Sequence, residues 1–101
     1  MRIVRTTIDD KEKAEEISER LVEERLVACV NIIPVRSVYR WKNKIEKEDE
    51  FVMTIKTREN LVDDVIERIK QLHPYELPVI EVVHTEKANE EAEQWLNEVT
   101  K

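Results

Sequence analysis

The residue types best suited to binding chemistry are concentrated in residues 72–78, LHPYELP, which hold a histidine, a tyrosine and two prolines. His73 could ligate copper or another divalent metal through an imidazole nitrogen, a common protein donor for such ions. It could equally be a helix-terminal histidine that hydrogen bonds the last carbonyl groups. Both interpretations stay open, because a single histidine lacks the spacing of a ligand pair.

The second histidine and the only cysteine also have more than one possible role. His84 ends a strand-like run, where a surface or packing role is the simpler interpretation. Cys29 lies among apolar residues, and a free cysteine there usually behaves as a small hydrophobic side chain; metal ligation is the alternative. Neither serine lies in a nucleophile elbow, and no acid–histidine pair has a spacing that indicates acid–base work. We therefore expect a protein that is not an enzyme.

Aromatic and charged residues from three parts of the chain could line one cleft between subunits. The aromatic members have an alternative role in interface packing, where such residues are enriched. The expected cleft residues are Tyr39, Trp41, Glu46, Asp49, Lys56 and Tyr75.

Length and composition predict a single cytoplasmic domain spanning residues 1–101. The net charge of −6 disfavours binding to nucleic acid and to anionic lipid. No apolar run approaches the ~18 residues that a membrane span needs. One cysteine cannot build an internal disulfide framework and fits a reducing compartment.

Glycine is absent from the chain. Phosphate-binding loops and dinucleotide fingerprints use glycine to bring backbone N–H groups close to phosphate, so these sites are not expected. The lack of glycine, together with abundant glutamate and lysine, also predicts a thermostable protein.

Apolar periodicity and turn residues predict four strands and three helices. The order is βαββαβ followed by a C-terminal helix, which is the α+β, ferredoxin-like arrangement of an antiparallel sheet with two helices on one face. The expected strands cover about 2–8, 26–41, 45–57 and 79–85, and the expected helices about 10–25, 58–72 and 90–100.

Each expected helix has a capping candidate and an apolar stripe. Asp9 could cap the first helix in a capping box with Glu12, Thr57 the second and Asn89 the third. The stripes are Ala14, Ile17, Leu21 and Val22; then Leu61, Val62, Val65, Ile66, Ile69 and Leu72; and finally Ala92, Trp95, Leu96 and Val99.

The second strand is long for a domain of this size. Sixteen extended residues at ~3.3 Å each reach ~50 Å, whereas such a domain has a radius of gyration of ~13 Å. The hairpin of strands two and three should therefore project, and its apolar residues on both sides predict a homo-oligomer. Pro34 indicates an edge strand or a bulge, and Asn43 is the best candidate for a positive φ in the turn.

These motifs together resemble the CutA divalent-cation-tolerance family. The matching segments, in order, are RLVACVNI (25–32), the Tyr39 and Trp41 pair, KIE (44–46), DE (49–50), KT (56–57) and LHPYELP (72–78). The resemblance implies a ferredoxin-like homotrimer linked to tolerance of divalent metals, copper especially. It also implies similarity to trimeric PII signalling proteins, which place ligands in clefts between subunits.

Two positions depart from the family pattern. Asn43 stands where family members usually have a turn glycine. Arg5 stands where some members have a cysteine that is associated, together with the histidine of the HPYE segment, with copper. Since a guanidinium does not ligate metal, that copper site is in doubt here.

Four other functions are alternatives to metal tolerance. A PII-like sensor or scaffold would bind a small molecule or protein at the subunit cleft. An acylphosphatase shares the fold class, but the lack of glycine opposes its anion loop. An RNA-binding module is opposed by the charge, and a copper chaperone by the absence of a CxxC motif.

Overall fold

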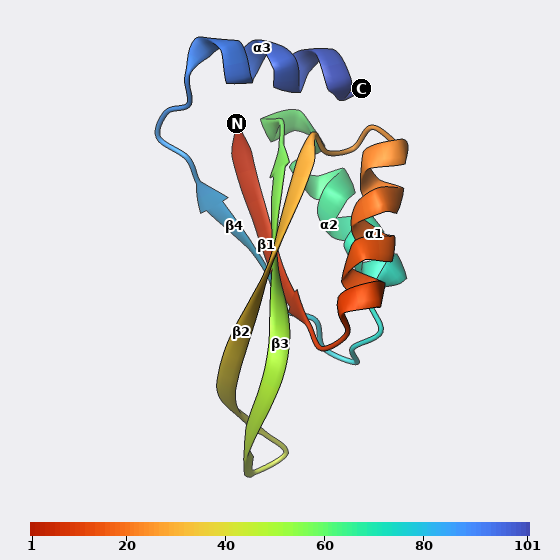
Figure 1. The fold of residues 1–101 in the computed structure, drawn as a ribbon, viewed down its shortest axis with the longest axis vertical. Helices are drawn as coiled ribbons and strands as arrows, with labels where there is room; N and C mark the ends of the chain where they lie inside the picture. The colour runs from red at the N-terminus through yellow and green to blue at the C-terminus, as the bar shows by residue number, and fades with distance from the viewer.

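A four-stranded antiparallel sheet forms the centre of the molecule in the computed structural model, which describes residues 1–101. Its strands are β1 (Arg2–Ile8), β2 (Cys29–Trp41), β3 (Lys44–Thr57) and β4 (Ile80–His84), in the spatial order β2-β3-β1-β4. The helices are α1 (Lys11–Glu23), α2 (Val62–Leu72) and α3 (Glu90–Val99), with a short 3₁₀ turn η1 (Glu59–Leu61) before α2. Figure 1 shows α1 and α2 on one side of the sheet and α3 across one end. The predicted ferredoxin-like fold is confirmed.

The core lies between the sheet and the pair α1 and α2. Alternate residues of β1 face the helices, so Val4 and Ile8 are fully buried, as is Met53 on β3. Leu21 of α1 and Ile69 of α2 belong to the same core cluster as these strand residues. The apolar residues that alternate along the strands and those that recur every 3.6 residues along the helices therefore pack together in one layer.

One predicted stripe member of α1 and three of α3 are not buried in the chain. Val22 is 43% exposed, because Ala14, Ile17 and Leu21 already fill the face that packs on the sheet. In α3 only Leu96 is buried, and Trp95 is 41% exposed. The helix lies across the end of the sheet rather than on its face, and Leu96 is its one buried residue.

Two of the predicted caps are wrong. The carboxylate of Asp10, not Asp9, accepts from the Lys13 backbone N–H at 3.2 Å and begins α1 one residue later. Thr57 remains in β3, where its hydroxyl donates to the Leu26 carbonyl oxygen at 2.6 Å. Asn89 does hold the N-cap position of α3, but its side-chain nitrogen donates to Glu91 instead of its oxygen accepting from the backbone.

The first helix ends earlier than expected because Arg25 takes a left-handed conformation, with φ 58°. The next residues, Leu26 and Val27, are buried in the connection, and β2 begins at Cys29. The predicted strand beginning at residue 26 is therefore three residues too long.

The hairpin of β2 and β3 projects as predicted. β1 pairs with β3 only as far as Ile8 opposite Phe51, so residues 35–50 form a two-stranded ribbon beyond the body. The molecule is 45 Å long as a result (Figure 1). Pro34 lies on the outer strand β2 with no bulge, since its register with β3 is unbroken. The turn places both Lys42 (φ 49°) and Asn43 (φ 66°) in the left-handed region, which is typical of a type I′ turn.

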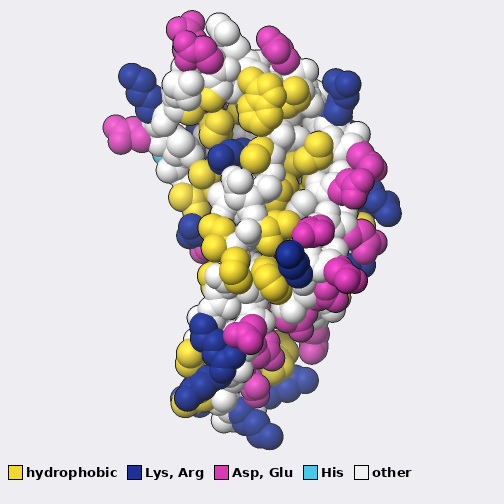
Figure 2. Space-filling view, viewed as in Figure 1, with side chains coloured by type: hydrophobic (Ala, Val, Ile, Leu, Met, Phe, Trp, Pro, Cys, Tyr) yellow, Lys and Arg dark blue, Asp and Glu magenta, His cyan; other side chains and the backbone are white.

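The surface keeps several large apolar side chains in contact with solvent. Val38 and Ile45 on the ribbon are each 63% exposed, and Leu77 and Val79 after α2 are each 64% exposed. Figure 2 shows apolar side chains along the middle of one face, acidic ones over the α1 side, and basic ones at the hairpin end. None of the helices is long and apolar enough to span a membrane.

Candidate functional site

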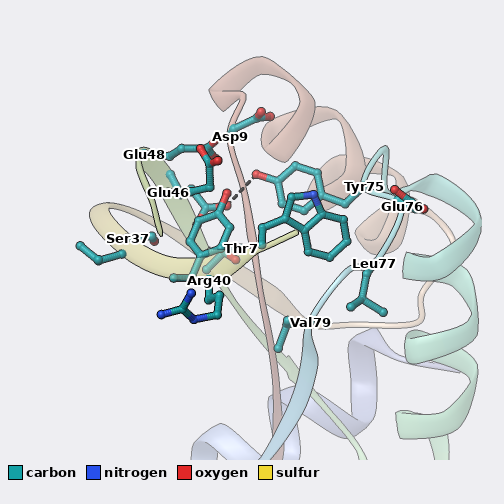
Figure 3. Close-up of a pocket in the computed structure, with 14 residues that line it drawn as sticks. Thr7, Asp9, Ser37, Arg40, Glu46, Glu48, Tyr75, Glu76, Leu77 and Val79 are labelled. Carbon is teal, nitrogen blue, oxygen red and sulfur yellow. Dashed lines mark hydrogen bonds between the residues drawn. The ribbon is translucent and has the colours of Figure 1, made fainter. Parts of the chain in front are cut away.

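The main concave site is a cleft of about 820 Å³ between the projecting ribbon and the segment that follows α2. The ribbon contributes Tyr39 and Trp41 from β2 and alternate glutamates from β3, and the segment contributes Tyr75, Leu77 and Val79. Figure 3 shows Glu46, Glu48 and Asp9 grouped on one side of this cleft, with Leu77 and Val79 on the other. The cleft thus has an acidic side and an apolar side.

Tyr75 and Glu50 form the floor of the cleft. The phenol oxygen of Tyr75 donates to Oε2 of Glu50 at 2.6 Å, and the Glu50 residue is only 5% exposed (Figure 3). Burial, and then the hydrogen bond to the Glu50 carboxylate, raise the pKa of the Tyr75 phenol above its usual value of about 10. Tyr75 is therefore a hydrogen-bond donor, not an acid, across the physiological range.

His73 lies behind the floor, with both ring nitrogens in use. Nε2 lies 2.8 Å from the carbonyl oxygen of Thr7, and Nδ1 lies 3.1 Å from the backbone nitrogen of Tyr75. Because a carbonyl only accepts, Nε2 carries the proton and Nδ1 accepts from the Tyr75 N–H. The ring is 7% exposed and packs edge-on against Tyr75 at 4.6 Å. This geometry fixes the turn after α2, which ends at Leu72 before Pro74 as the sequence predicted.

Tyr39 lies at the more open end of the cleft, facing the glutamates of β3. The neighbouring Glu48 carboxylate, followed by partial burial, raises the pKa of the Tyr39 phenol to about 12. An ionised Tyr39 would meet the negative charge of Glu46 and Glu50 as well, so the neutral phenol is favoured.

The rim of the cleft already holds one ammonium group. Nζ of Lys42 lies 5.6 Å from the centre of the Trp41 ring and 3.8 Å from Oε2 of Glu76. An aromatic face and a carboxylate therefore share one cation at the entrance.

Two of the residues expected in a cleft between subunits lie outside this cleft of the single chain. Asp49 points to the opposite face of the ribbon, where its carboxylate pairs with Arg36 at 3.1 Å. Lys56 lies in the body of the sheet, opposite Ile3 and Cys29, far along β3 from the ribbon. Tyr39, Trp41, Glu46 and Tyr75 do line the cleft.

Period-two alternation explains which ribbon residues line the cleft of the single chain. In β3, residues 46, 48 and 50 share one face with residues 39 and 41 of β2, and residue 49 does not. The sequence reasoning missed Glu48 and Glu50, which alternation alone indicates. It also missed Asp9 and Glu76, which only the three-dimensional fold brings to the cleft.

The other candidates for chemistry stand apart from the cleft. Cys29 begins β2 as a half-buried thiol, 3.8 Å from the side-chain oxygen of Asn31. His84 ends β4 opposite Arg2 and is exposed. The Arg5 guanidinium pairs with Glu81 at 3.0 Å on the sheet surface.

The cleft is strongly acidic but holds no ready-made metal site. Five carboxylates and one guanidinium line it. No three His, Cys, Asp or Glu side chains of the chain converge closely enough to hold a metal ion. A single chain thus attracts cations without enclosing one.

Comparison with known proteins places the chain clearly. The family model described as CutA1 divalent ion tolerance protein matches residues 2–99. The divalent-cation tolerance protein CutA of Pyrococcus horikoshii is 45% identical over 101 residues, which cover 100% of this chain and 99% of that protein.

Two solved structures are similar throughout their length. The periplasmic divalent cation tolerance protein CutA from Archaeoglobus fulgidus superimposes with a TM-score of 0.96 at 36% identity, covering 100% of both chains. The PII-like protein CutA from a Nostoc species gives 0.94 at 35% identity, covering 100% of this chain and 98% of that one. The family description names tolerance of divalent ions and no reaction. The chain is a member of the CutA divalent-cation tolerance family.

Proposed function

We propose that this protein is a cytoplasmic homotrimer that contributes to divalent-cation tolerance by binding Cu²⁺ or another divalent ion, without catalysing a reaction. The observation that carries the proposal is the excess of carboxylates in the cleft, five against one guanidinium. Carboxylate oxygens attract divalent cations, and the surrounding low-dielectric walls strengthen that attraction.

The trimer is supported by surfaces that one chain leaves uncovered. β2 and β4 are the two edges of the sheet, and each presents unpaired backbone groups. The hairpin of β2 and β3 exposes Val38 and Ile45 on one face and Ile33 and Tyr39 on the other. Further copies of the chain would pair these edges and cover this apolar surface.

The metal ligands are proposed to come from two subunits, because one chain brings no three donors together. Glu46 and Glu48 of β3 are accessible oxygen donors, as are Asp9 and Glu76 at the edges of the cleft. His73 could join only by giving up its contact with Thr7 or with the Tyr75 backbone. Cys29 would act as a separate thiolate, since it lies in the body of the sheet.

A calorimetric copper(II) titration of the untagged protein tests this proposal, with Glu48→Gln and His73→Ala beside it. Saturable binding at a fixed ratio per trimer, weakened by Glu48→Gln, supports the cleft as the site. Loss in His73→Ala alone would make the segment after α2 the site instead. Heat that never saturates and is the same in both variants would contradict direct binding.

The cytoplasmic location is proposed from the single free cysteine, Cys29, which fits a reducing compartment. The Archaeoglobus fulgidus relative is described as periplasmic, so the two locations need to be separated by experiment. Fractionation of cells that express the untagged protein should place it with soluble cytoplasmic markers. Recovery in an extracytoplasmic fraction would contradict the proposal.

A PII-like role is the second candidate, because three aromatic rings line a cleft large enough for a small molecule. The Nostoc structure, described as a PII-like protein, has the same fold. A ligand for such a cleft should protect the subunit interface against dissociation. Protection by copper but by no organic ligand would favour the metal role.

A further inference from the structure

The two faces of the projecting ribbon, residues 35–50, carry opposite charge. Strand pairing places residues 36, 38 and 40 of β2 on the same face as residues 45, 47 and 49 of β3, and the residues between them on the cleft face. The first of these, the basic face, has three bases and one acid: Arg36, Arg40, Lys47 and Asp49. The cleft face has three acids and one base: Glu46, Glu48, Glu50 and Lys44. The ribbon is therefore +2 on one face and −2 on the other.

Glu50 is the one acid of the cleft face that is buried, and its hydrogen bonding is incomplete within one chain. It is 5% exposed, and the only hydrogen bond of its side chain is the one that Oε2 accepts from the Tyr75 hydroxyl at 2.6 Å. The chain has two side-chain polar atoms that are unpaired and sealed from solvent, and neither belongs to Glu50, so its unpaired Oε1 remains reachable from the cleft. A carboxylate this deeply buried is costly without a cationic partner.

Arg40 is the matching unpaired group on the basic face. It is exposed and forms no ion pair with any carboxylate of its own chain. Figure 3 shows its side chain apart from the acidic group of the cleft, although the residue borders that cleft. Arg40 cannot reach Glu50 of its own chain, because the strand register puts them on opposite faces and five positions apart along the ribbon, or about 17 Å. These two groups can pair only between chains.

A closed ring of identical chains, such as a trimer, brings the two faces together. Each subunit of a ring uses two different surfaces, so one face of its ribbon meets the other face of the next ribbon. Complementary charge favours contact between the basic face and the cleft face, whereas two like faces would repel each other. The same contact covers Val38 and Ile45, which are each 63% exposed on the basic face.

We propose that Arg40 of one chain enters the cleft of the neighbouring chain and pairs with Glu50 beside Tyr75. The guanidinium donates to the free Oε1 of Glu50, while the Tyr75 hydroxyl keeps its bond to Oε2. The floor of the cleft is thus built from two subunits and is incomplete in one. The inference rests on the homotrimer of the proposed function, and it names the residue that each copy supplies to the next.

Subunit exchange measures this contact in the assembled protein. Unlabelled and isotope-labelled wild-type trimers are mixed at a urea concentration at which their subunits exchange over hours, and mixed trimers are measured by native mass spectrometry after buffer exchange. Arg40→Gln, in which both samples carry the substitution, should speed exchange about tenfold or more, because losing one partner of a buried charge pair acts mainly on dissociation. An unchanged rate would overturn the proposal.

A matched variant separates this contact from the net charge of the protein. Arg20 is exposed on α1, away from the ribbon, and Arg20→Gln changes the net charge by the same amount. Exchange in this variant should stay within about twofold of the wild-type rate. Equal acceleration by Arg20→Gln and Arg40→Gln would overturn the proposal in favour of a general charge effect.

The partner of Arg40 is identified by a double-mutant cycle. Glu50→Gln should also speed exchange, and the double variant should exchange no faster than the faster single variant, because both substitutions remove the same contact. Effects of the two substitutions that simply multiply would show that the two side chains do not meet, and would overturn the proposal.

Crosslinking tests the same pair without altering Glu50. Arg40→Lys keeps the positive charge and supplies an amine, which a carbodiimide joins directly to a neighbouring carboxylate. We expect a crosslinked peptide that joins position 40 to Glu50, and the separation of about 17 Å within one chain requires that this link be between chains. Links from position 40 to other carboxylates only, or none, would contradict the pair.

Failure of this inference can be told apart from failure of the trimer. A wild-type protein that sediments as a trimer, with exchange unchanged in Arg40→Gln, would overturn the inference and leave the trimer standing. A wild-type protein that stays monomeric would overturn both.

Discussion

The Tyr75 hydroxyl and the Glu50 carboxylate, 2.6 Å apart, join the segment after α2 to the base of the projecting ribbon. Glu50 is the first residue of β3 beyond its pairing with β1, so the contact forms where the ribbon leaves the body. No salt bridge to Glu50 is formed within the chain, and its carboxylate therefore depends on the phenol for its buried hydrogen bond. Tyr75 fixes both the floor of the cleft and the angle of the ribbon.

Replacing Tyr75 with phenylalanine should lower the free energy of unfolding by about 1–3 kcal/mol, because it leaves the Glu50 carboxylate buried without its donor. Urea denaturation followed by circular dichroism measures the change. Tyr39→Phe is the matched control, since its phenol is 37% exposed and its loss should cost under about 1 kcal/mol. An equal decrease in the free energy of unfolding in the two variants would show that the buried hydrogen bond stabilises the protein no more than the exposed one.

The two tyrosines also predict how stability depends on pH. Both phenols have raised pKa values in the folded protein, about 12 for Tyr39 and higher still for Tyr75, against about 10 when unfolded. Their contribution is therefore fully present below pH 10. It is lost as the pH rises from about 10 through the folded values, because only the unfolded chain has then released these protons.

Phenolate absorbance provides the measurement for this pH dependence. The chain has only two tyrosines, so the native protein should show little phenolate at pH 10.5, about half a unit above the reference value, whereas urea-unfolded protein should be mostly ionised. Tyr39→Phe assigns the two transitions. Native titration near pH 10 in both tyrosines would contradict the proposed contacts with Glu48 and Glu50.

Thr57 should contribute to stability through the connection between α1 and β2. Its fully buried hydroxyl donates to the Leu26 carbonyl oxygen at 2.6 Å, and valine has nearly the same shape without the donor. We expect Thr57→Val to lower the free energy of unfolding by about 1–3 kcal/mol. Thr54→Val, on the other face of β3, is the control and should change it by less than about 0.5 kcal/mol. The reverse order of effects would be inconsistent with this contact.

Heat stability is predicted from composition and remains a prediction. The absence of glycine reduces the conformational freedom of the unfolded chain, and charged residues make up 40% of the sequence. We expect a melting temperature above the ~45–65 °C range of mesophilic domains. Scanning calorimetry measures it, and melting below about 60 °C would contradict the expectation.

Much of the fold could be predicted because its patterns are local. The alternation in β1 and the apolar stripe of α2 each follow from the period of one element, and Pro34 indicated an edge strand. The helix starts were less accurate, because adjacent aspartates at 9 and 10 are both capable caps. The backbone φ values that favour Asp10 depend on how β1 leaves the sheet.

The residues that line the cleft of the single chain follow from the sequence only in part, for a different reason. Tyr39, Trp41 and Glu46 can be chosen because they lie near the hairpin turn. The face of the ribbon on which each side chain lies, however, depends on the strand register. Glu48 and Asp49 are adjacent in β3 and therefore lie on opposite faces, so Glu48 is inside the cleft and Asp49 is outside it. Asp9 and Glu76 reach the cleft only because β1 and α2 end beside the ribbon, and no local pattern encodes that approach.

The exposed apolar surface of the ribbon is the main reason to expect that three copies of the chain associate. Sedimentation velocity of the untagged protein at micromolar concentration measures this association. We expect one species with three times the 12.1 kDa mass of the chain. A species of 12.1 kDa at all concentrations would contradict it, because the open edges of β2 and β4 and the exposed ribbon would then face solvent.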